Sequence, residues 1–94
     1  MATVYKKLVE KLRLAIQTRN EQIAEALKKD FGKCEFETFA TEIMGTLDEI
    51  DLAIKNLHRW TKARKVISPL VLFKSTSRIY CEPFGSVLVI SAWN

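Results

Sequence analysis

Apolar residues recur at helical spacing from the start of the chain. Val4, Leu8, Leu12 and Ile16 follow one another at intervals of four, and lysines and glutamates stand between them. This pattern predicts a surface helix with one apolar stripe. A polar interruption after Ile16 ends the first stripe.

A second apolar stripe follows this interruption. Asn20 is suited to cap a new helix, and Gly32 suits the left-handed position just after its end. We therefore expect two helices, or one helix that bends near Arg19 and Asn20. The apolar positions of the second stripe are Ile23, Ala26 and Leu27.

The longest helical pattern covers residues 36–60. Apolar residues alternate between spacings of four and three, so one face stays apolar for about seven turns. Acidic residues come early and basic residues late, as the helix dipole favours. We expect this face to pack on the first two helices, although it could also dimerise. Its apolar positions are Phe36, Ala40, Ile43, Leu47, Ile50, Ile54, Leu57 and Trp60.

The pattern changes to strands after Ala63. Residues 65–73 are rich in β-branched and apolar residues, and Pro69 makes this segment an edge strand or a broken one. A polar turn, KSTS, leads to RIYCE, residues 78–82, in which apolar and polar side chains alternate. These features predict a hairpin with one packed face.

The last apolar run, SVLVISA at residues 86–92, does not alternate. Such a run after a glycine turn predicts a strand buried on both faces, as in a parallel sheet. Ligands of open α/β sheets bind at the carboxyl ends of strands, which makes Trp93 and Asn94 candidates for a site. Alternatively, Trp93 only closes the core and Asn94 begins a turn. The unpaired strand should also favour aggregation or need a partner.

Composition fits one small domain of a soluble protein, since 48% of the 94 residues are hydrophobic and 28% are charged. No apolar run reaches the roughly 20 residues of a membrane helix, so no integral membrane segment is expected. The amino terminus lacks a secretory signal pattern, and we expect a cytoplasmic protein. Cys34 and Cys81 have no neighbours at metal-ligand spacing, which predicts free thiols and no metal site.

The net charge of +4 comes from 15 basic and 11 acidic residues. The segment HRWTKARK, residues 58–65, combines basic residues with an aromatic one, as nucleic-acid binders do. Cations are also favoured at helix ends, and this simpler explanation is preferred, so no nucleic acid is expected. A basic nucleic-acid-binding module and a helical interaction protein that uses residues 36–57 remain the alternatives.

The segment EPFGSVLVISAWN, residues 82–94, resembles the start of the coenzyme domain in the aldehyde dehydrogenase superfamily. That family pattern is E-P-x-G, an aliphatic run, a small residue or Pro, then Trp and Asn. The segment ALKKDFGK is similar to the family's helix end, and the segment from Glu37 to Trp60 is similar to its long second helix. The short amino terminus is most similar to the class 3 branch.

The resemblance implies an α/β fragment in three parts. Residues 1–64 would form the amino-terminal helical region, and residues 65–84 an oligomerisation-type β-hairpin. Residues 85–94 would form the first strand of an incomplete, Rossmann-like coenzyme domain. The parent enzyme would oxidise an aldehyde to a carboxylic acid with NAD or NADP, and it would form a homodimer or a higher homo-oligomer.

The resemblance also assigns site residues. Asn94 matches the family amide that stabilises the oxyanion formed when a catalytic Cys attacks the aldehyde. Ser91, Ala92 and Trp93 match the strand end that lines the cofactor cleft, and Ala92 stands where the family often has Pro. The catalytic Cys, the general-base Glu and the cofactor glycine turn are expected after Asn94. The 94 residues alone are therefore predicted to be inactive.

Overall fold

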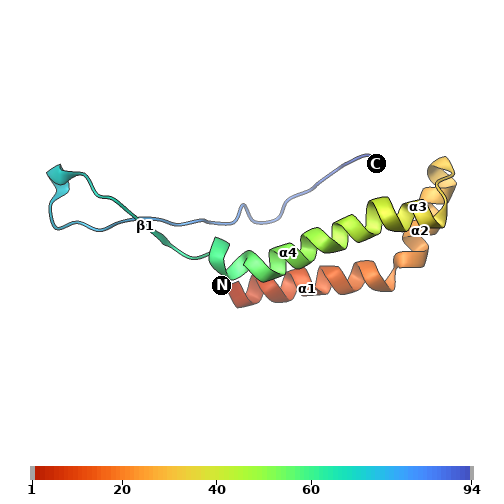
Figure 1. Cartoon of the computed structure of the whole chain (residues 1–94), viewed down its shortest axis with the longest axis horizontal. Helices are drawn as coiled ribbons and strands as arrows, with labels where there is room; N and C mark the ends of the chain where they lie inside the picture. The colour runs from red at the N-terminus through yellow and green to blue at the C-terminus, as the bar shows by residue number, and fades with distance from the viewer. Residues whose placement is uncertain (1, 94) are drawn as a thin grey trace.

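The computed structural model describes residues 2–93, and helices fill the first two thirds of them (Figure 1). Helix α1 spans Ala2–Thr18 and α2 spans Asn20–Phe31. A short α3, Glu35–Thr38, leads through the π-helical segment η1, Phe39–Ile43, into α4, Met44–Trp60. The predicted helices are thus confirmed. No helix within residues 2–93 combines the length and the apolar character needed to cross a membrane.

The break between α1 and α2 falls at Arg19. Arg19 occupies the N-cap position of α2 with φ −106° and ψ 17°, and no side chain caps this helix. The expectation that Asn20 caps α2 is therefore wrong, because Asn20 is already the first helical residue. Gly32 behaves as predicted: it is left-handed with φ 69°, and its N–H donates to the carbonyl of Lys28 at 2.9 Å.

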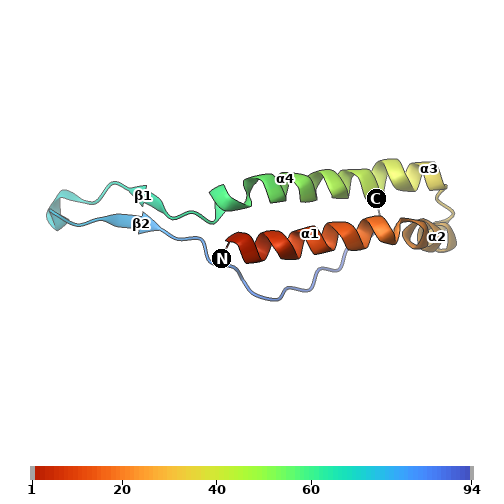
Figure 2. The same cartoon turned by 90° about the horizontal axis from the view of Figure 1, so that it is seen from below.

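Helices α1 and α4 run side by side and antiparallel in both views (Figures 1 and 2). The contact face of α1 is only partly the predicted stripe. Most of that stripe is more than half exposed, because α4 covers only a narrow face of α1. The exposed fractions are 58% for Val4, 55% for Leu8 and 53% for Leu12. The half-buried positions are Ala2, Tyr5, Val9, Arg13, Ala15 and Ile16.

An ion pair joins α1 to α4 at the middle of this interface. The guanidinium of Arg13 donates to both carboxylate oxygens of Asp51, from Nε at 2.6 Å and from Nη2 at 3.0 Å. These hydrogen bonds lower the pKa of Asp51 below its ordinary value, and desolvation opposes them only in part. They raise the pKa of Arg13 for the same reason. The pair therefore fixes how α1 lies along α4.

The predicted helix over residues 36–60 is continuous but not uniform. In the π-helical segment η1, the N–H of Met44 bonds to the carbonyl of Phe39, five residues back. Such a turn holds one residue more than an α-turn and rotates the apolar face after it relative to the face before it. As a result Ile43 and Ile50 are buried, whereas Phe36, on the other side of the π-turn, is 78% exposed.

The core is small: part of it lies where α2 meets α3 and η1, and Ile50 lies farther along, in the middle of α4. The described residues that are buried are Leu27, Thr38, Ile43 and Ile50. The hydroxyl of Thr38 has no hydrogen-bond partner there. A half-buried ion pair also joins Lys33, in the loop before α3, to Glu42 in η1, with 3.1 Å between Nζ and Oε1.

The predicted hairpin is present but short. Strand β1, Arg64–Val66, pairs antiparallel with β2, Ser77–Ile79, and Lys65 lies opposite Arg78. The segment 65–73 is broken, as one of the two expectations had it: β1 already ends at Val66, and Pro69 precedes a 3-10 turn, η2, at Leu70–Leu72. The expected packed face is wrong within residues 2–93, because the hairpin extends away from the helices (Figure 2) and its apolar side chains are exposed.

Residues 83–93, which we call the tail, form no strand in the structure. Gly85 is left-handed with φ 88°, and the backbone bends at Ser86. Within residues 2–93 no backbone hydrogen bond joins the tail to another segment. A strand exists only with a ladder partner, so the strand expected over residues 86–92 does not form in this chain.

Candidate functional site

The tail runs back beside the helical region after it leaves the hairpin (Figures 1 and 2). Its aliphatic side chains are largely exposed, from 66% for Val87 to 88% for Ile90. Ser91, Ala92 and Trp93, the predicted cofactor-binding residues, follow directly and are exposed as well. Asn94, the predicted oxyanion residue, lies outside the described residues.

Two side chains at the end of the tail donate hydrogen bonds, one to a neighbouring residue and one to a residue far away in the sequence. The hydroxyl of Ser91 donates to the neighbouring carbonyl of Ala92 at 3.3 Å, a local contact. The indole Nε1 of Trp93 donates to Oδ2 of Asp30 at 2.9 Å, across 63 positions of sequence. This second bond connects the end of the tail to α2.

Asp30 was not identified as a site residue in the sequence. It lies in the last turn of α2, between Lys29 and Gly32, where a carboxylate is disfavoured by about 0.3–1 kcal/mol through the helix dipole. An acidic side chain at a helix carboxyl end was the available signal. Its partner 63 positions away could not be found without the fold.

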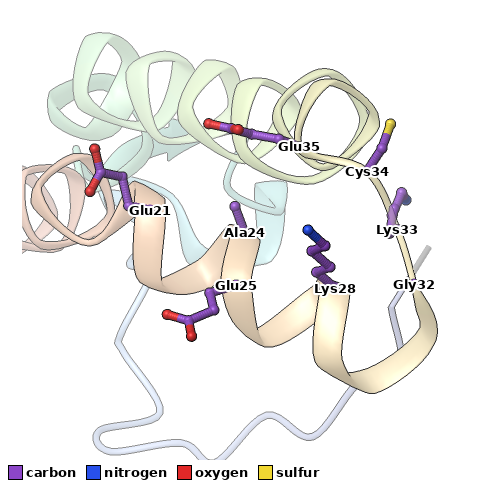
Figure 3. A pocket seen from close by; sticks show the side chains of 8 residues that line it. All are labelled: Glu21, Ala24, Glu25, Lys28, Gly32, Lys33, Cys34 and Glu35. Atoms are coloured by element: carbon purple, nitrogen blue, oxygen red, sulfur yellow. The ribbon is translucent and has the colours of Figure 1, made fainter.

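The hollow beside this helix end is open and carries mixed charge (Figure 3). It measures about 480 Å³ and lies between α2 and the loop that leads to α3. Glutamate and lysine side chains surround it, and Figure 3 shows the sulfur of Cys34 turned away from Ala24 and Lys28. That sulfur accepts a hydrogen bond from the N–H of Glu37 at 3.5 Å, so Cys34 caps α3.

Both cysteines are free thiols, as expected. Among residues 2–93, no group of three or more His, Cys, Asp or Glu side chains is placed to hold a metal ion. A larger hollow of about 610 Å³ lies at the base of the hairpin, where Tyr5, Leu57 and Trp60 give it an apolar lining. The indole of the basic segment 58–65 therefore lines a groove between α1 and α4.

Comparison with known proteins gives this arrangement a family. Residues 2–94 match the aldehyde dehydrogenase family. The chain belongs to this family. A Staphylococcus aureus relative, 4,4'-diaponeurosporen-aldehyde dehydrogenase, is 45% identical over 89 residues, which cover 95% of this chain and 19% of the relative. The aldehyde dehydrogenase family 3 member B3 of Mus musculus is 43% identical over 79 residues, 84% of this chain and 16% of that protein.

A solved aldehyde dehydrogenase structure confirms the fold class. The substrate-bound state of Staphylococcus aureus AldH superposes with a TM-score of 0.83 at 42% identity, over 88% of this chain and 18% of that chain. The resemblance to class 3 enzymes is confirmed by the family 3 relatives. This aldehyde dehydrogenase chain spans about a fifth of the length of the relatives that it matches.

In this aldehyde dehydrogenase chain, the role of Ser91, Ala92 and Trp93 in holding a cofactor stays a prediction. Ser91 and Ala92 offer one hydroxyl and one methyl group on an exposed segment, and the single indole donor of Trp93 is engaged by Asp30. Tight dinucleotide sites combine a glycine turn with a helix amino terminus, which the tail lacks. The division into residues 1–64, 65–84 and 85–94 stays a prediction.

Proposed function

We propose that this chain is part of an NAD(P)-dependent aldehyde dehydrogenase, which oxidises an aldehyde to a carboxylic acid through a cysteine thiohemiacetal. The match to the family over residues 2–94 carries the proposal. NAD or NADP would accept the hydride in that reaction.

Asn94 would supply the part of the chemistry that this chain contains. When a thiolate attacks an aldehyde, the carbonyl oxygen gains negative charge, and a fixed amide N–H can stabilise that charge. Removal of one such donor costs about 10²–10³-fold in kcat in known oxyanion holes. The catalytic Cys and the general base would come from elsewhere in the enzyme, since Cys34 serves as a helix cap and Cys81 lies beyond β2.

We also propose that the enzyme is cytoplasmic and forms a homodimer or a higher homo-oligomer. The hairpin supports the oligomer, because its tip exposes a cluster of large apolar side chains. Such clusters mark interaction surfaces in soluble proteins. The exposed fractions are 97% for Ile67, 93% for Leu70, 94% for Val71 and 81% for Phe73.

A hybrid enzyme tests the proposed function. Residues 1–94 would replace the matching stretch of the Staphylococcus aureus relative, and aldehyde-dependent formation of NADH or NADPH would be followed by absorbance. We expect the hybrid to be active and Asn94→Ala to lower kcat by about 10²–10³-fold. The 94-residue chain alone should oxidise no aldehyde.

Asn56→Ala is the matched control, because the side chain of Asn56 only donates to the carbonyl of Leu52 in its own helix. It should leave kcat unchanged. An inactive hybrid, or an Asn94→Ala hybrid that keeps its full kcat, would overturn the proposed function.

A further inference from the structure

The hydrogen bond between Trp93 and Asp30 suggests a role for Asp30 that does not require contact with the substrate. We infer that Asp30 is a positioning residue for the amide of Asn94 and that it acts through the indole of Trp93. The inference rests on the proposed function, because it gives Asn94 its oxyanion role. It adds a residue of α2, 64 positions before Asn94, to the machinery of the reaction.

The tail has few other contacts within residues 2–93. Phe84 is fully exposed and Leu88 is 84% exposed, whereas Trp93 is 45% exposed, so the tail is covered mainly at Trp93. Its backbone has no ladder partner among residues 2–93. Within residues 2–93, the long-range hydrogen bond of the tail is the one from the indole of Trp93 to the carboxylate of Asp30.

The acceptor lies on a packed part of the helical region. Leu27, one turn before Asp30, is fully buried, and Gly32 closes the helix through its bond to Lys28. Asp30 itself is unfavourable for the helix that carries it, because the carboxyl end of a helix disfavours negative charge. A residue that breaks a local preference is expected where it serves another purpose.

The donor, the indole of Trp93, is suited to restrict the position of the neighbouring residue. An indole is a rigid plane with two side-chain torsions, and its N–H can only donate. Holding that plane against α2 restricts the backbone of Trp93, to which Asn94 is joined directly. Reactions in enzymes are sensitive to such placement, since a shift of about 1 Å in a reacting group can cost on the order of 10²-fold in rate.

The first experiment examines the bond in the 94-residue chain itself. Labelling tryptophan with ¹⁵N gives two indole signals, and Trp60 serves as the internal reference. We expect Asp30→Ala to speed hydrogen exchange at Nε1 of Trp93 by about ten-fold or more, while Asp30→Asn, which keeps an acceptor oxygen, largely preserves it. Asp48→Ala, a change at an exposed acid of α4, is the control. An unchanged Trp93 signal in Asp30→Ala would overturn the inference.

The second experiment measures kcat and KM in the hybrid enzyme. Asp30→Ala should lower kcat by about ten-fold with little change in KM, and Asp30→Asn should restore most of it. Trp93→Phe removes the donor instead of the acceptor and should give a similar loss, which guards against a folding defect in one variant. Asp48→Ala should leave kcat unchanged.

The decisive comparison places Asp30→Ala in an Asn94→Ala background. If Asp30 acts through Asn94, it should cause no further loss of kcat there. An equal ten-fold loss in both backgrounds would show a general structural role and overturn the inference. If Asn94→Ala itself has no effect, the proposed function fails. If Asn94→Ala lowers kcat and Asp30→Ala does not, only the inference fails.

Discussion

The helical region, residues 2–60, buries part of its side chains within the chain. The extended region, residues 64–93, does not. All the described buried side chains, Leu27, Thr38, Ile43 and Ile50, belong to the helical region. The extended region has none, although its sequence is rich in aliphatic residues. A helix makes its backbone hydrogen bonds within itself, whereas a strand needs a neighbouring strand. The helical region therefore has regular secondary structure, and most of the extended region has none.

The overall dimensions reflect this difference. The chain measures 64 × 23 × 22 Å, and its radius of gyration is 19.4 Å. A compact domain of this length would have a radius of gyration of roughly 12 Å. The accessible surface is 8336 Å², against about 5,500 Å² expected for a folded monomer of this mass. The excess surface belongs mainly to the extended region, which leaves its apolar side chains largely exposed.

The largest effect should come from the same substitution made in each region. Leu27→Ala removes a side chain that is 0% exposed, and it should lower the free energy of unfolding by about 2–5 kcal/mol. Leu88→Ala, at a position 84% exposed, should change it by less than about 0.5 kcal/mol. Urea unfolding followed by circular dichroism measures both. Equal effects would mean that the tail is packed in solution.

The sequence predicted the helices better than their faces. Period and end signals located the helices and the role of Gly32, because both are local properties. Ile43, at the end of the π-helical segment, is buried, whereas Phe36, before that segment, is exposed, and the spacing did not reveal the π-turn. The face of α1 depended on which single neighbour covers it. Tertiary contacts, not periodicity, decide these features.

Two glycines should respond to alanine with opposite signs. Gly32→Ala forces a left-handed residue to carry a Cβ, which should cost roughly 1–2 kcal/mol even though no atom lies within 4 Å of the new group. Gly45→Ala places the same group within the continuous helix, also in open space, and should stabilise by roughly 0.5–1 kcal/mol. Thermal and urea unfolding check the signs. A stabilising Gly32→Ala would show that the left-handed end of α2 is absent in solution.

The sequence predicted only those residues of the candidate site that belong to one continuous motif. The pattern from Glu82 to Asn94 identified the family, since it combines a turn, an aliphatic run and a Trp-Asn pair. It could not identify Asp30, because a bond across 63 positions follows from how the tail returns along α2. The strand expected over residues 86–92 does not form, because residues 2–93 give it no ladder partner.

The smallest effect concerns the ion pair between α1 and α4, and it should depend on pH. The hydrogen bonds from Arg13 lower the pKa of Asp51 in the folded state, so the folded chain holds this proton less tightly than the unfolded chain does. The pair therefore stabilises the fold above the ordinary pKa of Asp, about 3.9, and loses its contribution as the pH falls through the folded value. Arg13 stays charged throughout, since its pKa is raised.

Asp51→Asn tests this dependence by urea unfolding. The variant should be slightly less stable than the parent chain at pH 7, and the difference should vanish once the pH has fallen below the folded pKa of Asp51. Because the Asp51 side chain is 50% exposed and that of Arg13 is 32% exposed, solvent reaches the pair, and added salt should shrink the difference at pH 7 as well. Asp48→Asn changes the same charge in the same helix at an exposed position outside the pair, and it should show a smaller pH dependence. A difference that persists at low pH would assign the role of Asp51 to packing instead of charge.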